Sequence, residues 1–560
     1  MKLPNSVAAL SFLAALHCSM QPTSTTRATV VPTGATIFAG ATVASGNAQT
    51  PRRNWSVFVA DGKVADLGPA ETIHRAHPDA RVVDVSGNTL LPGLTDAHGH
   101  LYGLGLSLDT VHLAGSHSYQ EAIDRVRDRA SKAPAGEWIL GRGWDQNRWD
   151  GKSFPTSAPL DAAVSDHPVW LRRVDGHAGV ANSMAMRAAG ITPTTPDPEG
   201  GRILRDAAGN PTGVFIDGAQ ALIDRAVPAP SFVLRKARIL AAAKQIAANG
   251  LTEMHDAGAD HDTIRAIREL IDEKKFPIRV YVMLTDDAAL LDQYLTSGPI
   301  IDYGGRMTVR SVKMYADGAL GSRGAALLAP YSDDPGNTGL LLTRTEHILA
   351  VARRARAAGF QVNSHAIGDR GVRNVLDAYQ AAGVVAADRF RIEHLQVVAP
   401  TDFPRLAQHG IIASMQPTHA TSDMGWAEDR LGPERIRGAY AWRTVLDSGA
   451  RLALGSDFPI EEVNPFFGIY SAVTRQDQSG QPAGGWYPSQ KLTLTEAIRG
   501  FTSDAAYAAF EEGSRGTIEP GKLADFTIVE GDLYSMPQSE LFQAKVRYTV
   551  VGGEVVYEGR

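Results

Sequence analysis

Short apolar runs rich in β-branched residues mark both ends of the chain, and glycine and aspartate separate them. Runs of this kind, bounded by turn residues, are typical of a small antiparallel sheet. They cover residues 34–45, 54–68 and 80–93 near the N-terminus and residues 516–532 and 545–559 near the C-terminus. We therefore predict that residues 29–90 and 511–560 build one small β-sandwich domain together.

The middle of the chain has a different rhythm, in which strand-like apolar runs alternate with helical patterns. The clearest helical patterns lie at 233–250, 343–360 and 440–450. The eight strand-like runs lie at 91–98, 251–258, 278–284, 309–318, 360–369, 390–397, 410–417 and 451–459. Strands that alternate with helices build a parallel sheet, and eight of them close a (β/α)8 barrel. The predicted fold class is therefore α/β, with a TIM-like barrel over residues 91–510.

The alternation breaks between about residue 103 and residue 232. Clusters of tryptophan, glycine and proline take its place, as in GRGWDQNRW at 141–149. We interpret this segment as an insertion after the first barrel strand.

The N-terminal segment combines one early lysine, a short apolar stretch and a polar stretch rich in serine and threonine. The apolar stretch is too short to span a bilayer and resembles a secretory leader, here placed at residues 1–28. The only cysteine, Cys18, lies where a lipoprotein cysteine would sit, but a poor lipobox precedes it. We expect a periplasmic or secreted protein with no transmembrane span in the mature chain. Lipid anchoring through Cys18 is the weaker alternative.

Composition narrows the class of ligand. Of the 560 residues, 44% are hydrophobic and 21% are charged, as in an ordinary globular protein. The net charge is −6 and no basic stripe is present, which argues against a nucleic-acid partner and favours a small-molecule or peptide-like ligand. Without the leader the chain has no cysteine. Any metal ion must then be held by His, Asp, Glu or a modified Lys.

The first barrel run ends in two histidines separated by one glycine, in LTDAHGH at 94–100. Residues i and i+2 of an extended chain lie on the same side, so His98 and His100 can converge on one point. A metal-binding site needs ligand atoms that converge on one position in this way. An isolated pair of this kind is also common in a surface turn, so the other strands must decide.

Ionisable side chains also lie at or near the ends of later strand-like runs, and in a barrel the carboxyl ends of the strands carry the catalytic groups. Lys313 lies on the fourth run, His365 and His394 end the fifth and sixth, and Asp457 follows the eighth. Singly, the two histidines fit structural roles and Asp457 fits a helix cap. Together with the histidine pair, they predict one constellation at the barrel mouth.

The order of these residues resembles that of the amidohydrolase superfamily. The segments 80–100 and 516–529 look like its paired terminal signature. Longer motifs resemble its N-substituted formamide deformylase-like branch, amidohydrolase family 3, from about residue 35 to the C-terminus. Besides 141–149, these motifs are VKMYADGALGSRGAAL (312–327), NSHAIGDRGVRNVLDAY (363–379), RIEHLQVV (391–398), SMQPTHATSDM (414–424), DRLGPERIRGAYAWRTVLDSGARLALGSDFPIE (429–461) and LTEAIRGFTSDAAYAAFEEGSRG (494–516).

The resemblance implies a centre of two divalent ions. The implied ligands are His98, His100 and Asp457 for one ion and His365 and His394 for the other. Lys313 would bridge both ions as a carbamate formed with CO₂, because an ammonium has no lone pair whereas a carbamate offers two oxygens. An unmodified Lys313 in a salt bridge is the alternative. Zinc is the expected ion, although manganese or iron suits the same ligands.

The resemblance also implies hydrolysis of a carbon–nitrogen bond, other than a peptide bond, in a small N-substituted amide. Two ions about 3.5 to 4 Å apart would lower the pKa of a shared water toward ~7, and the metal-bound hydroxide would attack the carbonyl. Asp457 would take the proton from the water and return it to the departing nitrogen.

Three alternatives use the same centre: hydrolysis of a cyclic amide, of a carbamate, or of an N-acyl amino acid, including amide-containing toxins. An alternative of a different class is a catalytically silent binding or regulatory protein. Its signature would be missing ligands, and none is missing.

As far as the resemblance goes, a homodimer is common for such folds.

Several residues around the expected centre are candidate substrate contacts. Indole suits an apolar substituent, and amide or imidazole groups can orient a carbonyl. The candidates are Trp144, Asp145, His177, Asn182, Asp317, Arg323, Gln416 and His419. Each has a structural alternative, such as packing of the insertion for Trp144 and a turn cap for Asp317.

Two further residues have two interpretations each. Asp369 either orients His365 as a hydrogen-bond acceptor or caps the following helix, and the cap is preferred. His255 either supports the ligands or faces the substrate.

Overall fold

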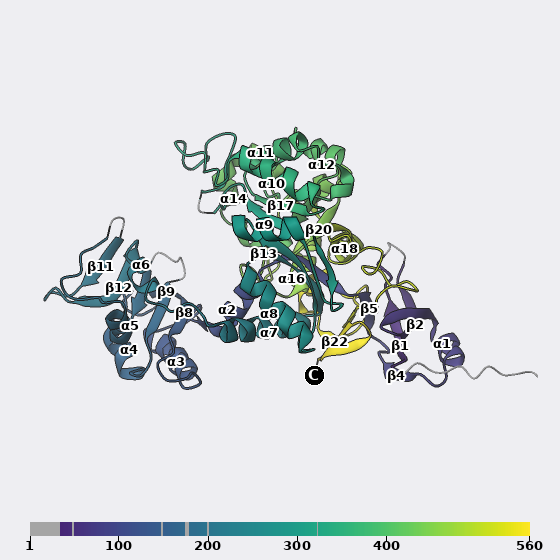
Figure 1. Ribbon diagram of the computed structural model, residues 1–560, viewed down its shortest axis with the longest axis horizontal. Helices are drawn as coiled ribbons and strands as arrows, with labels where there is room; N and C mark the ends of the chain where they lie inside the picture. The colour runs from purple at the N-terminus through teal and green to yellow at the C-terminus, as the bar shows by residue number, and fades with distance from the viewer. Residues whose placement is uncertain are drawn as a thin grey trace, which may run out of the picture.

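The computed structural model describes residues 34–46, 50–146, 149–173, 178–198, 201–321 and 323–559. The predicted leader, Cys18 and His177 lie outside these residues. Three sheets organise the described chain: a central parallel sheet, a sheet within the insertion and a sheet shared by the two ends. In Figure 1 the insertion lies on one side of the central sheet and the first strands of the shared sheet lie on the other.

Eight parallel strands form the central sheet and follow one another in chain order. They are β6 (Leu94–Gly99), β13 (Leu251–Ala259), β14 (Arg279–Thr285), β16 (Met307–Tyr315), β17 (Gln361–Ala366), β18 (Arg391–His394), β19 (Ile412–Met415) and β20 (Leu452–Leu454). A short strand, β15 (Ile300–Tyr303), pairs antiparallel with β16. Each predicted strand-like run overlaps one of the eight strands, which confirms the (β/α)8 fold class.

The side chain of Asp96 joins the first barrel strand to the loop that follows the last one. Its carboxylate accepts hydrogen bonds from the backbone N–H groups of His98 (3.0 Å) and Ser456 (3.1 Å). Gly455 leaves room for it, because a Cβ there would lie 2.5 Å from Asp96 Oδ1. Asp457 N–H then donates to the His98 carbonyl at 2.7 Å, so this junction places Asp457 beside the first strand.

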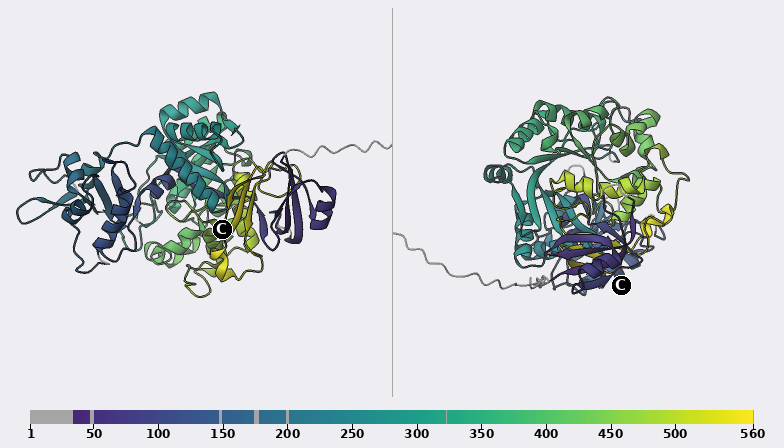
Figure 2. Two further views of the ribbon diagram at one scale, coloured as in Figure 1. Left: turned by 90° about the horizontal axis from the view of Figure 1, so that it is seen from below. Right: turned by 90° about the vertical axis from the view of Figure 1, so that its right-hand side faces the viewer.

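Helices surround the barrel, as the right-hand view of Figure 2 shows. Helix α8 (His261–Asp272) illustrates why: Asp260 caps its N-terminus, and Ile264, Ile267 and Leu270 are buried on one face. The other helices outside the insertion and the shared sheet are α2 (Leu101–Asp109), α7 (Phe232–Ala248), α9 (Ala288–Ser297), α10 (Thr345–Ala357), α11 (Asp369–Ala381), α12 (Phe403–His409), α13 (Pro417–Asp423), α14 (Ala427–Arg435), α15 (Trp442–Asp447), α16 (Pro465–Thr474), α17 (Leu494–Gly500) and α18 (Ser503–Ala508). Short 3-10 helices are η2 (Ala386–Asp388), η3 (Ile436–Gly438), η4 (Pro488–Gln490) and η5 (Gln538–Gln543).

The insertion between α2 and α7 carries its own six-stranded sheet, in the order β11-β12-β10-β9-β8-β7. Its strands are β7 (Val111–His112), β8 (Ile139–Trp144), β9 (Val169–Arg173), β10 (Ala178–Ala181), β11 (Gly201–Arg205) and β12 (Pro211–Asp217). Its helices are α3 (Tyr119–Ala130), α4 (Ser157–Ala163), α5 (Ser183–Ala188) and α6 (Gln220–Asp224). Trp144, Leu160 and Leu171 belong to a hydrophobic core formed entirely within this segment.

The two ends of the chain share one sheet, in the order β23-β22-β21-β5-β1-β2-β3, with β4 paired to β1. Its strands are β1 (Thr36–Val43), β2 (Arg52–Ala60), β3 (Lys63–Pro69), β4 (Arg81–Asp84), β5 (Thr89–Pro92), β21 (Phe526–Val529), β22 (Val546–Val551) and β23 (Glu554–Glu558), and helix α1 (Ala70–Ala76) packs on it. The ends meet where Phe526 pairs with Pro92, directly before the first barrel strand. A buried ion pair between Arg279 Nε and Asp525 Oδ2 at 2.8 Å ties this sheet to the barrel.

Within the described residues, every helix is too short or too polar to cross a membrane.

Candidate metal centre

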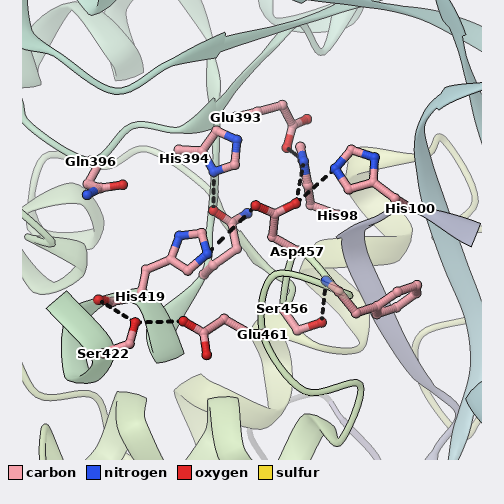
Figure 3. A network of polar contacts seen from close by, with 12 residues as sticks. His98, His100, Glu393, His394, Gln396, His419, Ser422, Ser456, Asp457 and Glu461 are labelled. Carbon is pink, nitrogen blue, oxygen red and sulfur yellow. Dashed lines mark hydrogen bonds and ion pairs between the residues drawn. The ribbon is translucent and has the colours of Figure 1, made fainter. Parts of the chain in front are cut away.

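The ionisable residues predicted from the strand ends lie together at the carboxyl end of the barrel. His98 lies on β6, one residue before its end, Lys313 lies on β16, His365 lies on β17 and His394 ends β18. His100 directly follows β6, and Asp457 follows β20. Figure 3 shows Asp457 between the His98 and His100 rings on one side and the His419 ring on the other.

The first cluster joins Asp457 to the two histidines of the opening motif. Asp457 Oδ1 lies 3.0 Å from His100 Nε2 and 3.5 Å from His98 Nε2. Bonds of about 2.0 to 2.1 Å to a tetrahedral zinc ion place neighbouring ligand atoms about 3.3 Å apart. The three side chains therefore fit one divalent ion.

The second cluster contains His394, His419 and Asp457. One ligand atom from each of these residues lies within 4.8 Å of the others. Asp457 Oδ2 lies 3.7 Å from His419 Nε2, so the two carboxylate oxygens face different clusters. The sequence prediction placed His419 among the substrate contacts, whereas the structure brings it into contact range of Asp457.

The backbone is strained at two residues of these clusters. His394 has φ 71° and Asp457 has φ 65°, in the left-handed region that most residues avoid. Strain of this kind is concentrated at functional sites, where the surrounding structure enforces it. Here it turns both side chains at the point where their strands end.

Lys313 is buried beneath the first cluster, with 1% of its surface exposed. Its Nζ lies 3.3 Å from His98 Nε2 and 4.7 Å from the centre of the Tyr315 ring. Burial lowers the pKa of Lys313, although Glu393 and Asp457 oppose this effect. Lowering the pKa favours the neutral amine, the form that can react with CO₂.

Two buried acceptors fix the orientation of the histidine rings. Glu393 Oε2 lies 2.5 Å from His98 Nδ1, and both side chains are fully buried. Gln416 Oε1 lies 2.8 Å from His394 Nδ1. With Nδ1 engaged, the Nε2 atom of each ring is left to face the clusters. Gln416, predicted as a substrate contact, is therefore used to hold His394.

Burial keeps the histidines neutral and able to act as ligands. The pKa values of His98 and His394 lie well below the ordinary value, chiefly because burial penalises the charged ring. Burial also lowers the pKa of His365 to about 3, with a further contribution from the charge of Lys313. A neutral imidazole keeps a lone pair, which metal binding requires.

His365 lies near the second cluster but faces a different partner. Its ring centre is 4.6 Å from that of His394, whereas its Nε2 lies 3.7 Å from Asp317 Oδ1. Asp317 accepts hydrogen bonds from the backbone N–H groups of Ala326, Ile367 and Gly368. The Asp317 carboxylate thus holds two loops together instead of facing a substrate.

The candidate substrate contacts of the insertion make hydrogen bonds and ion pairs with other residues of the insertion. Trp144 is buried and donates a hydrogen bond to the Leu171 carbonyl at 2.8 Å, and Asp145 forms an ion pair with Arg173. Asn182 caps α5 by accepting from Ala185 N–H. The contact of Trp144 matches its structural alternative of packing the insertion, and the partners of Asp145 and Asn182 likewise lie within the insertion.

Three other sequence candidates also have structural partners. Arg323 forms a surface ion pair with Asp333 at 2.9 Å. Asp369 begins α11 and accepts from Leu328 N–H at 2.8 Å. His255 is buried inside the barrel, with its Nδ1 2.8 Å from an Arg391 guanidinium nitrogen.

Sequence reasoning missed Glu393 and Asp96, which support the centre without belonging to either cluster. Glu393 directly precedes His394 in RIEH, and Asp96 stands two residues before His98 in TDAHGH. Their positions in sequence gave no signal, because Glu393 engages the distant His98 ring rather than that of its neighbour His394, and Asp96 accepts from backbone N–H groups.

The residues fit divalent metal ions on structural grounds. Asp457 Oδ1 and His419 Nε2 are buried and lack hydrogen-bond partners within the described residues. A buried polar atom without a partner is unfavourable, and a cation satisfies both a carboxylate oxygen and an imidazole nitrogen. Imidazole and carboxylate together are the ligand set that zinc prefers in the absence of thiolates.

Three known proteins resemble this chain over most of its length. The protein YtcJ of Bacillus subtilis (strain 168) is 34% identical over 515 residues, which cover 90% of this chain and 96% of that protein. The N-substituted formamide deformylase of Arthrobacter pascens is 28% identical over 536 residues, covering 90% and 95%. The crystal structure of an uncharacterized metal-dependent hydrolase from Pyrococcus horikoshii OT3 matches with a TM-score of 0.76 at 27% identity, covering 90% and 99%. A family profile described as "Amidohydrolase family" matches residues 81–557.

Proposed function

The chain belongs to the amidohydrolase family, and from this premise we propose that it hydrolyses the carbon–nitrogen bond of a small N-substituted amide in a metal-dependent reaction. The observation that carries the proposal is the position of Asp457, whose Oδ1 lies 3.0 and 3.5 Å from two imidazole nitrogens at the barrel mouth. The similarity to an N-substituted formamide deformylase supports this class of amide.

Two divalent ions, with zinc as the expected metal, would be held at this centre. The residues that would hold them are His98, His100, Lys313, His365, His394 and Asp457. When bound, such ions polarise a carbonyl oxygen and lower the pKa of a water molecule toward ~7. In this proposal Lys313 is a carbamate: its neutral amine adds to CO₂, one proton leaves, and the resulting anion offers two oxygens.

Asp457 moves the proton in the proposed reaction. Its carboxylate accepts a proton from the attacking water and donates it to the nitrogen of the departing amine, so that the carbon–nitrogen bond breaks without releasing a strongly basic amide anion. Glu393 and Gln416 keep the His98 and His394 rings in place during this exchange, because each engages the Nδ1 atom.

A substrate panel tests the proposal. The purified full-length chain is loaded with Zn²⁺ and offered N-substituted formamides, larger N-substituted amides, cyclic amides, carbamates and N-acyl amino acids. Amine release is measured by fluorescence derivatisation, and formate is measured with a coupled dehydrogenase. We expect zinc-dependent release of amine from N-substituted amides, with chelated protein as the control. A metal-loaded protein that cleaves none of them, or only the cyclic or carbamate substrates, would overturn the proposal.

A further inference from the structure

His419 stands at the metal centre without a role in the proposed reaction. It lies on α13, the helix that follows β19, and its side chain is 12% exposed. We propose that His419 is a ligand of the second divalent ion, together with His394 and Asp457. This inference rests on the proposed metal-dependent function.

The geometry brings three ligand atoms to one position. His419 Nε2 lies 3.7 Å from Asp457 Oδ2, and its ring stacks on that of His394 with centres 5.9 Å apart and planes 18° apart. One ligand atom from each of the three residues lies within 4.8 Å of the other two. Neighbouring ligands of one zinc ion lie about 3.3 Å apart, so a small inward shift completes the site.

The Nε2 atom of His419 is buried and has no hydrogen-bond partner within the described residues. Its distance of 3.7 Å from Asp457 Oδ2 is too long for a hydrogen bond. Leaving a buried imidazole nitrogen without a partner is unfavourable, whereas a cation between this nitrogen and the carboxylate satisfies both atoms.

Neighbouring residues hold α13 against the loop that carries Asp457. Gln416, the residue before α13, engages His394 Nδ1 at 2.8 Å. Ser422, on α13, donates a hydrogen bond of 2.6 Å to Glu461, four residues after Asp457 (Figure 3). The helix is therefore fixed to two parts of the second cluster, as expected for an element that presents a ligand.

His365 is another histidine close to this cluster. Its Nε2 atom is also buried without a hydrogen-bond partner within the described residues, and it lies 3.7 Å from Asp317 Oδ1, beyond hydrogen-bond range. No group of ligand atoms within 4.8 Å includes His365 among the described residues. The second cluster is closed by His419, which the sequence pattern did not assign to the metal.

The metal content of variants tests this inference. Wild-type chain, His419→Gln and His419→Asn are stripped, dialysed against graded free Zn²⁺ and analysed by mass spectrometry, and cobalt-loaded samples are compared by visible absorption. His347→Gln serves as the matched control, because His347 is half exposed and pairs with Asp286 on the surface. Circular dichroism and thermal melting of the metal-free proteins establish that the variants fold.

We expect two ions per wild-type and control chain. In both His419 variants the first ion should bind normally and the second should bind ~100-fold more weakly or not at all, since even supporting residues change affinity 10- to 100-fold. Folded variants that keep both ions at unchanged affinity, or a wild-type chain that binds a single ion, would overturn the inference. A wild-type chain that binds no ion would overturn the proposed function as well, whereas zinc-dependent hydrolysis by the wild type with unchanged metal content in the variants would overturn only the role of His419.

Discussion

Replacing Glu393 with glutamine removes the charge that holds His98 while leaving the size of the side chain unchanged. The 2.5 Å contact between Glu393 Oε2 and His98 Nδ1 is fully buried on both sides, so water cannot replace it. Because His98 is neutral, this contact is a hydrogen bond to a charged carboxylate, which is worth about 1.5–3 kcal/mol, and we expect the lower end because glutamine still accepts a hydrogen bond. Loss of such a partner also weakens metal binding about 10- to 100-fold, which corresponds to about 1.4–2.7 kcal/mol.

Two assays on the same protein separate these effects. Urea unfolding of the metal-free chain measures the change in the free energy of unfolding, and competition with a chromophoric chelator measures zinc affinity. Glu512→Gln is the matched control, because Glu512 forms a more exposed ion pair with Arg389 at 2.6 Å and should change stability by less than about 1 kcal/mol. If Glu393→Gln behaved like this control in both assays, the inference that Glu393 positions His98 would be refuted.

Three further predictions concern the reaction, the pH range and the junction of the two domains. At saturating zinc, kcat of Asp457→Asn for the amide should fall about 10²- to 10⁴-fold, since general acid and base catalysis is lost; a metal-loaded variant with near wild-type kcat would contradict the proton-transfer role. Burial lowers the pKa of His365 from 6.5 to about 3, so the unfolded chain binds more protons between these values. The contribution of His365 to stability, measured in urea titrations as the difference between the metal-free wild type and His365→Gln, should therefore be complete above pH 6.5 and decline toward pH 3; a difference that grows on acidification would contradict this assignment. Asp525→Asn should lower the free energy of unfolding by about 3–5 kcal/mol, because it leaves Arg279 buried without its charge partner, and an unchanged urea midpoint would exclude this role.

The barrel could be predicted because its strands carry strong local signals. Each of the eight apolar runs is short, buried and followed by turn residues, so each strand was visible without knowledge of its neighbours. The spacing of His98 and His100 suggested that the two rings converge, and Lys313 and Asp457 were added from their positions at strand ends. The spacing of the two histidines can be read from the sequence itself, and the placement of catalytic groups at strand ends is a general property of the barrel fold.

Contacts between distant segments could not be predicted in this way. Nothing in the local pattern shows that Glu393 reaches His98, 295 residues away in sequence. Asn182 was a candidate substrate contact because an amide group can orient a carbonyl, yet it caps a helix of the insertion. Trp144 carries an aromatic ring of the kind that binds apolar substituents, yet the insertion has a core of its own that buries it. Such roles depend on packing between elements, which periodicity does not report.

Anomalous diffraction at the zinc absorption edge, from crystals of the metal-loaded chain, would locate the ions bound at the barrel mouth. Two peaks are expected at the carboxyl end of the barrel, one contacted by His98, His100 and Asp457 and the other contacted by His394 together with His365 or His419. An absence of anomalous signal at this end of the barrel, with zinc bound elsewhere or not at all, would contradict this expectation.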